Sequence, residues 1–292
     1  MKKMTSRHVF VLFNTIFMLF IIFVTAYPLY YVVIASFSDP SALARQSGAM
    51  WLPLEPFTSN AYKIVFEHPQ IFTGFRNTLF VLVVGLIINM TLTMAGGYFL
   101  CIKGPGLKNA ISFMIIFTMY FSGGLVPTYL NVKDLGLMDS LWALILPGAI
   151  NTTNLIIMKS AFASIPDSLE ESARLDGASY LQILVKIMIP LSKATIAVLV
   201  LYYGVAHWNS WFNASIYLMD SNLYPLQLVT RNILNLTQMA EMMSGTGVDE
   251  MAETANLIKY ALIVVTTVPV LVLYPFLQKY FTKGVMVGAI KG

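Results

Sequence analysis

The sequence predicts an all-α membrane protein with six transmembrane helices, and three observations support this fold class. Hydrophobic residues make up 57% of the 292-residue chain and charged residues only 11%, whereas charged residues are about 25% of ordinary soluble domains. A helix needs about 20 mainly apolar residues to cross a bilayer. Six stretches of about that length or longer carry almost no charge, at residues 9–38, 77–102, 109–132, 140–158, 187–219 and 260–278.

The first stretch, residues 9–38, follows a basic N-terminus and precedes an Ala-Leu-Ala sequence at 42–44, so it resembles a cleaved signal peptide. The apolar region of a signal peptide is only about 7–15 residues long. Because this stretch is much longer, we expect a retained first span.

The connections of the remaining spans differ in kind. The glycine- and proline-containing sequence at 101–109 predicts a tight turn between the second and third spans. The third span contains "SGGLVP" at 122–127, which predicts a kink or break whose freed backbone groups need partners inside the protein. The fifth span carries Lys193 near its start, from where a long side chain can reach the membrane surface. A tail of residues 279–292 follows the sixth span.

The charges predict that both termini face the cytoplasm. With a cytoplasmic N-terminus, 12 of the 18 Lys and Arg residues but only four of the 14 acidic residues lie on the inner side, as the positive-inside rule expects. The net charge of +4 therefore reflects topology, and we do not expect nucleic-acid binding. Cys101 is the only cysteine, which excludes a disulfide or a cysteine metal cluster within one chain.

A polar segment at 164–186 separates the fourth and fifth spans. Ser168 and Glu171 have the spacing of a capping box, and Gly177 is placed to end that helix in a left-handed conformation. A Ser-x-x-Gln sequence at 179–182 then offers a second capping box. The segment predicts a short helix, a glycine corner and a second helix.

Two locations are open for the first of these helices. A helix that lies on lipid is expected to have a cationic polar face, yet this segment holds four acidic residues against the single Arg174 between 165 and 177. A short helix presented to a groove of another protein fits these charges better.

The segment resembles the cytoplasmic EAA loop of ABC-importer permeases, in which E-A-A is followed by three residues, a glycine and an apolar stretch ending in I-x-L-P. Ser172 stands where that pattern has its first alanine, and Ile189 stands where it usually has leucine. The stretches "FSDP", "GGLVPTYL", "WNSWF" and "KYFTKGVMVGAIKG" resemble the carbohydrate-uptake branch, similar to the maltose permease. The final stretch most resembles permeases for oligosaccharides derived from complex polysaccharides.

The resemblance implies a transport subunit of the bacterial cytoplasmic (inner) membrane that forms half of a sugar path by alternating access. Its implied partners are a second homologous permease, two ATP-binding subunits, an extracytoplasmic solute-binding protein, the sugar and membrane lipid. The loop helix would dock on an ATP-binding subunit, and the tail would reach between the two such subunits. The implied coupling residues are Glu171, Ser172, Ala173, Asp176, Gly177, Ala178 and Pro190, and the tail candidates are Lys283, Gly284 and Gly288.

The chain shows no catalytic motif. It lacks the G-x-x-x-x-G-K-[ST] sequence that binds ATP phosphates, so ATP and Mg are expected on the partner subunits and no cofactor on this chain. The three histidines are far apart and no H-E-x-x-H occurs, which disfavours a metal site or an intramembrane hydrolase. No Asp or Glu lies within the six spans, which argues against a proton relay.

Polar and aromatic residues within the second, fourth and fifth spans are candidates for the substrate path, because sugars are commonly held by aromatic faces and amides. The same residue types also form interfacial belts and bonds between helices. A stand-alone carrier or membrane enzyme, and a permease of the same type for a non-sugar solute, are the alternative functions. The substrate-path candidates are Asn89, Asn151, Asn154, Tyr203, His207, Trp208, Asn209 and Trp211, with Thr152, Thr153, Tyr202 and Asn213 nearby.

Overall fold

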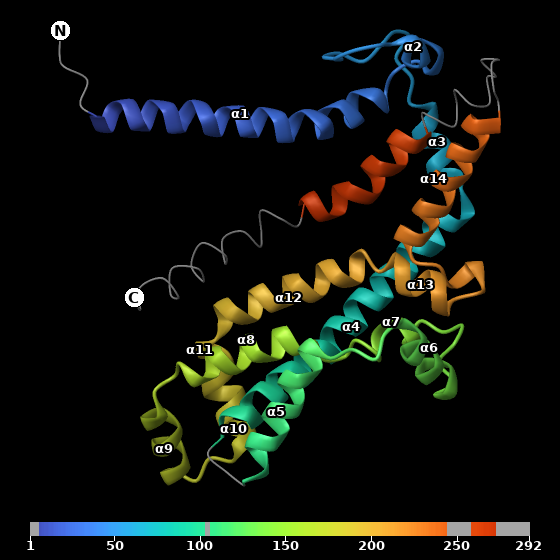
Figure 1. Cartoon of the computed structure of the whole chain (residues 1–292). Coiled ribbons are helices and arrows are strands. Elements are labelled where there is room, and N and C mark those ends of the chain that lie inside the picture. The colour runs from blue at the N-terminus through green and yellow to red at the C-terminus, as the bar shows by residue number, and fades with distance from the viewer. Residues whose placement is uncertain (1–5, 103–105, 244–257, 273–292) are drawn as a thin grey trace. The chain divides into compact units, whose positions relative to one another are not determined.

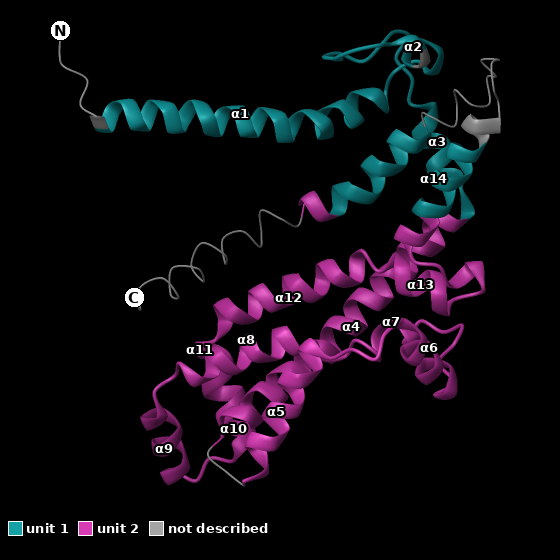
Figure 2. Cartoon of the chain, viewed as in Figure 1, with its two compact units in different colours: residues 1–69, 230–269 teal, residues 70–229, 270–292 magenta. Residues whose placement is uncertain are grey.

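The computed structural model describes residues 6–102, 106–243 and 258–272 (Figure 1). All regular secondary structure within these ranges is helical, which confirms the predicted all-α class. The chain forms two compact units, residues 1–69 with 230–269 and residues 70–229 with 270–292 (Figure 2). From its six spans the sequence predicts a single transmembrane permease domain over residues 1–292, and this stays a prediction.

The first unit contains α1 (Ser6–Ala35), α2 (Pro40–Arg45), α3 (Asn60–Glu67), most of α14 (Leu226–Met243) and most of the helix Ile258–Val272. The apolar side chains of α1 are largely exposed along its length, as expected for a helix in contact with lipid.

The segment after α1 folds back on the end of that helix through backbone and side-chain bonds. The Asp39 carboxylate accepts from the Ala42 amide at 2.9 Å and caps α2. The Ser38 hydroxyl accepts from the Leu54 amide at 3.0 Å, and the Ser36 hydroxyl is 2.6 Å from that of Tyr62 on α3. The bonds of Ser36 and Ser38 hold the returning segment against the end of α1.

The second unit contains the long helix α4 (Pro69–Cys101) and a series of shorter helices (Figure 1). A one-turn 3-10 helix (Ser221–Leu223) precedes α14. The others are α5 (Leu107–Tyr120), α6 (Leu125–Asp134), α7 (Trp142–Ile145), α8 (Thr152–Ala163), α9 (Asp167–Leu175), α10 (Tyr180–Ile183), a π-helical turn (Leu184–Met188), α11 (Ile189–Leu191), α12 (Lys193–Trp208) and α13 (Trp211–Tyr217).

Two apolar clusters form the core of this unit, and α4 contributes to both. The first joins Val81 of α4 to residues of α6, α7, α13 and the start of α14. The second joins Met90 and Tyr98 of α4 to α8, α10, the π-helical turn and α12. Two polar residues in this part of α4, Asn89 and Thr93, are fully buried.

Several predicted spans differ from the observed helices. The first matches α1 closely, and the second begins eight residues earlier than predicted, at Pro69 of α4. The third is broken as predicted, with 119° between α5 and α6. The prediction of a continuous fourth helix over 140–158 is wrong, because the Pro147-Gly148 sequence interrupts it between α7 and α8.

The fifth predicted span, 187–219, is also not one helix. It bends by 87° at Ser192 and is interrupted again at 209–210, between α12 and α13. Hydropathy measures how apolar a stretch is. A series of short apolar helices therefore has the same hydropathy as one long helix of the same composition.

Two described helices, Arg7–Ala35 of α1 and α4, are long and apolar enough to cross a membrane. The number of possible spans rises to four if α5 with α6 counts as one span and Tyr180–Leu191 with α12 counts as another. The sixth predicted span, 260–278, is described only to Val272, where the helix Ile258–Val272 covers it. The count of six and the orientation of the termini stay predictions.

Candidate functional site

The predicted helix–glycine–helix segment is present, with a well-formed turn at Gly177. This residue has φ +79°, a left-handed conformation that glycine adopts at little cost. Its amide donates to the Arg174 carbonyl at 3.0 Å, and the Ala178 amide donates to the Ala173 carbonyl at 2.9 Å. These two bonds form a Schellman motif, which ends α9 and turns the chain sharply into α10.

The capping pattern of the two helices confirms one prediction and corrects another. Ser179 and Gln182 form the predicted capping box of α10, with reciprocal bonds of 3.3 and 2.8 Å. The predicted box of Ser168 and Glu171 is wrong, because α9 begins at Asp167 and Pro166 occupies the cap position. Proline fixes φ where a helix starts and has no amide to satisfy, so α9 starts two residues earlier than the Ser-x-x-Glu spacing predicts.

Arg174 links the two arms of the corner. Its guanidinium donates to the Glu170 carboxylate at 2.5 Å within α9 and lies 4.6 Å from the ring centre of Tyr180 on α10. The hydrogen bond to Glu170 raises the pKa of Arg174 above its ordinary value. An ion pair and a cation–π contact through one side chain favour a fixed angle between α9 and α10.

The corner has an inward and an outward side. Ala173 and Ala178 are half-buried and pack against the chain's own second core cluster. Glu171, Ser172 and Asp176 are exposed, and so is Leu175, with 90% of its surface accessible. The outward side therefore offers acidic and hydroxyl groups around one bare apolar side chain.

Pro190 follows the corner at the base of the next bend. Proline lacks an amide proton and disrupts the i→i−4 pattern, and here the preceding turn is π-helical, with the Ile189 amide bonded to the Leu184 carbonyl. The chain then turns by 87° at Ser192 into α12. The corner is thus connected to α12 through a short, irregular helical segment.

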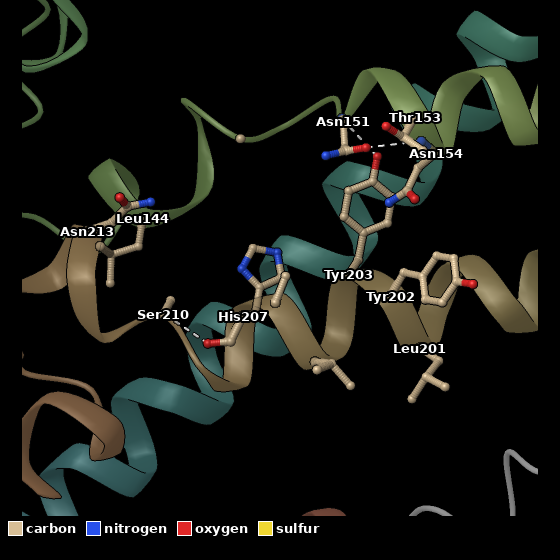
Figure 3. A pocket seen from close by; sticks show the side chains of 13 residues that line it. Leu144, Asn151, Thr153, Asn154, Leu201, Tyr202, Tyr203, His207, Ser210 and Asn213 are labelled. Atoms are coloured by element: carbon tan, nitrogen blue, oxygen red, sulfur yellow. Dashed lines mark hydrogen bonds between the residues drawn. The ribbon is translucent and has the colours of Figure 1, made fainter. Parts of the chain in front are cut away.

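A second candidate site is a cavity of about 680 Å³ within the second unit (Figure 3). Its walls come from α7, the segment 146–151, α8, α12 and the residues that follow α12. No ionisable acid, lysine or arginine is among the lining residues. They are Leu144, Gly148, Asn151, Thr153, Asn154, Leu201, Tyr202, Tyr203, Val205, Ala206, His207, Ser210 and Asn213.

Two polar contacts fix one wall of this cavity to the helices behind it. The His207 Nε2 atom is 2.6 Å from Asn89 Oδ1, and Asn89 Nδ2 donates to the carbonyls of Gly148 and Ala149, each at 2.9 Å. One turn away, the Tyr203 hydroxyl is 2.8 Å from Thr93 Oγ1 and accepts from the Asn151 amide at 3.0 Å. Both contacts join α4, α12 and the non-helical segment 146–151.

The Asn151 side chain also starts α8. Its Oδ1 accepts from the Asn154 amide at 3.0 Å, as an N-cap residue does. The chain between α7 and α8 is therefore bonded at Gly148, Ala149 and Asn151, and the carbonyls of Gly148 and Ala149 are directed toward α4.

The structure brings four of the eight substrate-path candidates together on the cavity wall, namely Asn151, Asn154, Tyr203 and His207. The other four do not line it. Asn89 is fully buried behind His207, and Asn209 donates to the Val205 carbonyl. Trp208 is buried against Phe75, and Trp211 packs on the first core cluster.

Some lining residues were outside the predicted set. Gly148 and Ser210 belong to the interruptions of the predicted fourth and fifth spans, and hydropathy gives no signal for such breaks. The exposed Leu175 was also missed, although its position next to Asp176 in a polar loop makes it unusual. The tail candidates Lys283, Gly284 and Gly288 lie outside the described residues.

Comparison with known proteins gives a consistent result. Residues 105–287 match the family described as binding-protein-dependent transport system inner membrane component. The chain is 39% identical to Protein LplC of Bacillus subtilis (strain 168), covering 100% of this chain and 98% of that protein. It is 41% identical to the polygalacturonan/rhamnogalacturonan transport system permease protein YtcP of the same organism, covering 94% and 96%.

Solved structures give the same result as the sequence comparisons. A bacterial ABC transporter involved in the import of the acidic polysaccharide alginate contains a chain 32% identical to this one, with a TM-score of 0.84 over 94% of this chain and 98% of that chain. A second chain, from an alginate transporter complex, shares only the fold, at 15% identity and a TM-score of 0.53. This chain belongs to the family of binding-protein-dependent transport system inner membrane components.

Proposed function

We propose that this chain is the transmembrane permease subunit of an ATP-driven importer and forms half of the path for an oligosaccharide derived from a complex polysaccharide. The observation that carries this proposal is the exposed corner of α9 and α10. Its Schellman turn at Gly177 and its Arg174 contacts favour a fixed angle, and its outward side presents Glu171 and Leu175, while Arg174 is paired with Glu170. Family membership and the named relatives support the sugar class.

The corner is the contact through which ATP-binding subunits would act. Two such subunits, each holding ATP and Mg, would dock one on this chain's α9 and one on a second homologous permease. A rigid corner that continues through α10 and the π-helical turn into α12 would transmit their closure to the cavity wall. An extracytoplasmic binding protein would deliver the sugar from the other side of a bacterial cytoplasmic membrane.

The cavity suits a sugar on chemical grounds. Its polar groups are amides, hydroxyls and one imidazole, and Tyr202 and Tyr203 supply aromatic surface. These groups hydrogen-bond to hydroxyls at modest energy per contact, so a substrate can be held and then released. The absence of charged lining residues makes a small ionic solute a poorer match.

The docking proposal predicts a graded response at Gly177. Valine in a left-handed conformation is strongly disfavoured, whereas asparagine tolerates it. We expect Gly177→Val to abolish co-purification of the ATP-binding subunit and Gly177→Asn to retain most of it, measured by affinity purification through this chain at equal membrane levels. Full co-purification with Gly177→Val would show that the corner is not the docking element.

The sugar class is tested separately, by uptake in whole cells with and without this chain. The panel is radiolabelled trigalacturonate, an alginate trisaccharide, a rhamnogalacturonan oligosaccharide and maltotriose. We expect chain-dependent uptake of at least one acidic oligosaccharide. Uptake of none of them, with the ATP-binding subunit still co-purifying, would favour a permease of the same type for a non-sugar solute.

A further inference from the structure

The side-chain amide of Asn89 has only one possible orientation. Two backbone carbonyls, of Gly148 and Ala149, lie 2.9 Å from one of its terminal atoms. Carbonyl oxygens only accept hydrogen bonds, so that atom must be the nitrogen, whose two protons are then both used. The Asn89 oxygen must in consequence face His207.

This orientation decides the protonation of the neutral His207 ring. The Asn89 oxygen can only accept, and it lies 2.6 Å from His207 Nε2, so Nε2 must carry a proton. In a neutral imidazole the other nitrogen, Nδ1, is then an acceptor with a free lone pair. No described residue bonds to His207 Nδ1.

The free nitrogen faces the cavity side of the ring. The two nitrogens of an imidazole point in widely different directions, so Nδ1 points away from Asn89. In Figure 3 the two ring nitrogens of His207 lie on different sides of the ring, one of them toward the side on which Asn213 lies. Both His207 and Asn213 line the cavity.

The edge of the His207 ring fits into space that Gly85 leaves open. A Cβ atom added at Gly85 of α4 would lie 2.5 Å from His207 Nε2 and 2.8 Å from Cε1. The absence of a side chain at Gly85 therefore creates the space in which the imidazole edge reaches Asn89. His207 is 7% exposed, so only a small part of its surface remains accessible.

We propose that Asn89 is a positioning residue that holds His207 in the neutral Nε2–H tautomer, so that Nδ1 accepts a hydrogen bond from a hydroxyl of the transported sugar. That the ligand is a sugar rests on the proposed function, whereas the tautomer of His207 rests on the geometry alone. An acceptor of this kind selects a hydroxyl donor and disfavours a carboxylate, whose oxygens also only accept. The acidic groups of a charged oligosaccharide would thus be recognised elsewhere.

The tautomer is tested without any sugar, in the assembled complex with only this chain labelled with ¹⁵N-histidine. Solid-state NMR separates protonated from unprotonated ring nitrogens, and the His207 signals are those missing from His207→Gln. We expect a protonated Nε2 and an unprotonated Nδ1 in the wild-type chain. Asn89→Leu should give a mixture of tautomers, whereas Thr93→Val, one turn along the same face of α4, should leave the wild-type pattern.

The acceptor role is tested by equilibrium binding of trigalacturonate and of its methyl ester to the purified permease–ATPase complex. Glutamine at 207 can still donate to Asn89 but places no acceptor at the position of Nδ1. We expect His207→Gln to raise the Kd of both compounds by a similar factor of about 3–10, the size expected for one lost hydrogen bond.

Each outcome bears on one part of the inference. A protonated Nδ1 in the wild-type chain, or an unchanged pattern in Asn89→Leu, would overturn the role of Asn89 whatever the substrate is. Equal affinities for wild type and His207→Gln, or a loss confined to the charged trigalacturonate, would overturn hydroxyl recognition by Nδ1. Failure of the wild-type complex to bind either compound would count against this sugar class, and with it the role of Nδ1, while the NMR result would still decide the tautomer.

Discussion

At the residue scale, single atoms decide how α4 and α12 meet. Gly85 leaves room for the His207 ring, and Asn89 satisfies two carbonyls and the imidazole with one amide. Each of these contacts joins residues far apart in the sequence. Their effects are therefore local in space but depend on the approach of three segments of the second unit.

Two glycines on these facing helices should respond differently to the same change. In Gly85→Ala the new methyl group would overlap the buried His207 ring, and we expect a loss of about 1–3 kcal/mol in the free energy of unfolding, the usual cost of overpacking. In Gly204→Ala of α12 the nearest atom is 4.0 Å away, and alanine favours helix. Thermal unfolding of the purified chain in detergent measures both.

The opposite ranking, with Gly204→Ala the less stable variant, would contradict the close approach of Gly85 to His207. Gly204→Ala also controls for the general effect of a methyl group on these helices, because both substitutions have the same chemistry.

At the element scale, short helices are held by specific end contacts. Asp139 precedes α7 and has φ 55°. Its carboxylate accepts from the amides of Met219 and Asp220, each at 2.9 Å, and its own amide donates to the Tyr217 carbonyl at 2.8 Å. This one residue ties the entrance of α7 to the end of α13.

The tie at Asp139 should depend on pH. The two backbone donors, that of Asp220 first, lower the pKa of Asp139 below its ordinary value of 3.8. A lowered pKa in the folded state means that its contribution to stability is present above pH 4 and is lost as the pH falls through the folded-state value. We expect the melting temperature of the wild type to fall more steeply below pH 4 than that of Asp139→Asn.

Asparagine at 139 tolerates the left-handed backbone and keeps an oxygen acceptor but does not titrate, so it isolates the charge. Asp139→Ala, which loses both acceptor oxygens, should melt at a lower temperature than either at pH 7. Parallel pH profiles for wild type and Asp139→Asn would show that the carboxylate charge does not contribute.

At the scale of the whole molecule, the predicted orientation can be tested in a single-cysteine chain. After Cys101→Ser removes the only native thiol, a cysteine is placed at exposed Ser172 on α9 or at exposed Gln46 after α2. A membrane-impermeant maleimide should label Gln46→Cys in spheroplasts and Ser172→Cys only in inverted vesicles. The reverse pattern would place the corner of α9 and α10 on the outer side and remove the basis for ATPase docking.

The sequence alone determined the all-α membrane class, the break in the third span and the turn at Gly177, because each follows from local chemistry. Apolar stretches reveal lipid-compatible helices, and glycine in a polar loop reveals a left-handed turn. Residues such as Asn151, Tyr203 and His207 were recognisable as candidates by type. Their mutual positions were not, and Asn89, Trp208, Asn209 and Trp211 could not be separated from them by sequence.

The Pro147-Gly148 sequence marks the break between α7 and α8, but only the tertiary structure decided that α12 ends at Trp208 and that Asn89 lies behind the cavity wall. The physical reason is that these positions depend on contacts between distant segments, such as the hydrogen bonds that join α4 and α12 to each other and to the segment 146–151. Hydropathy depends on composition along the chain, whereas these bonds depend on which segments pack together. The sequence thus identified the elements and the turn that joins them, and packing selected the side chains that form the cavity.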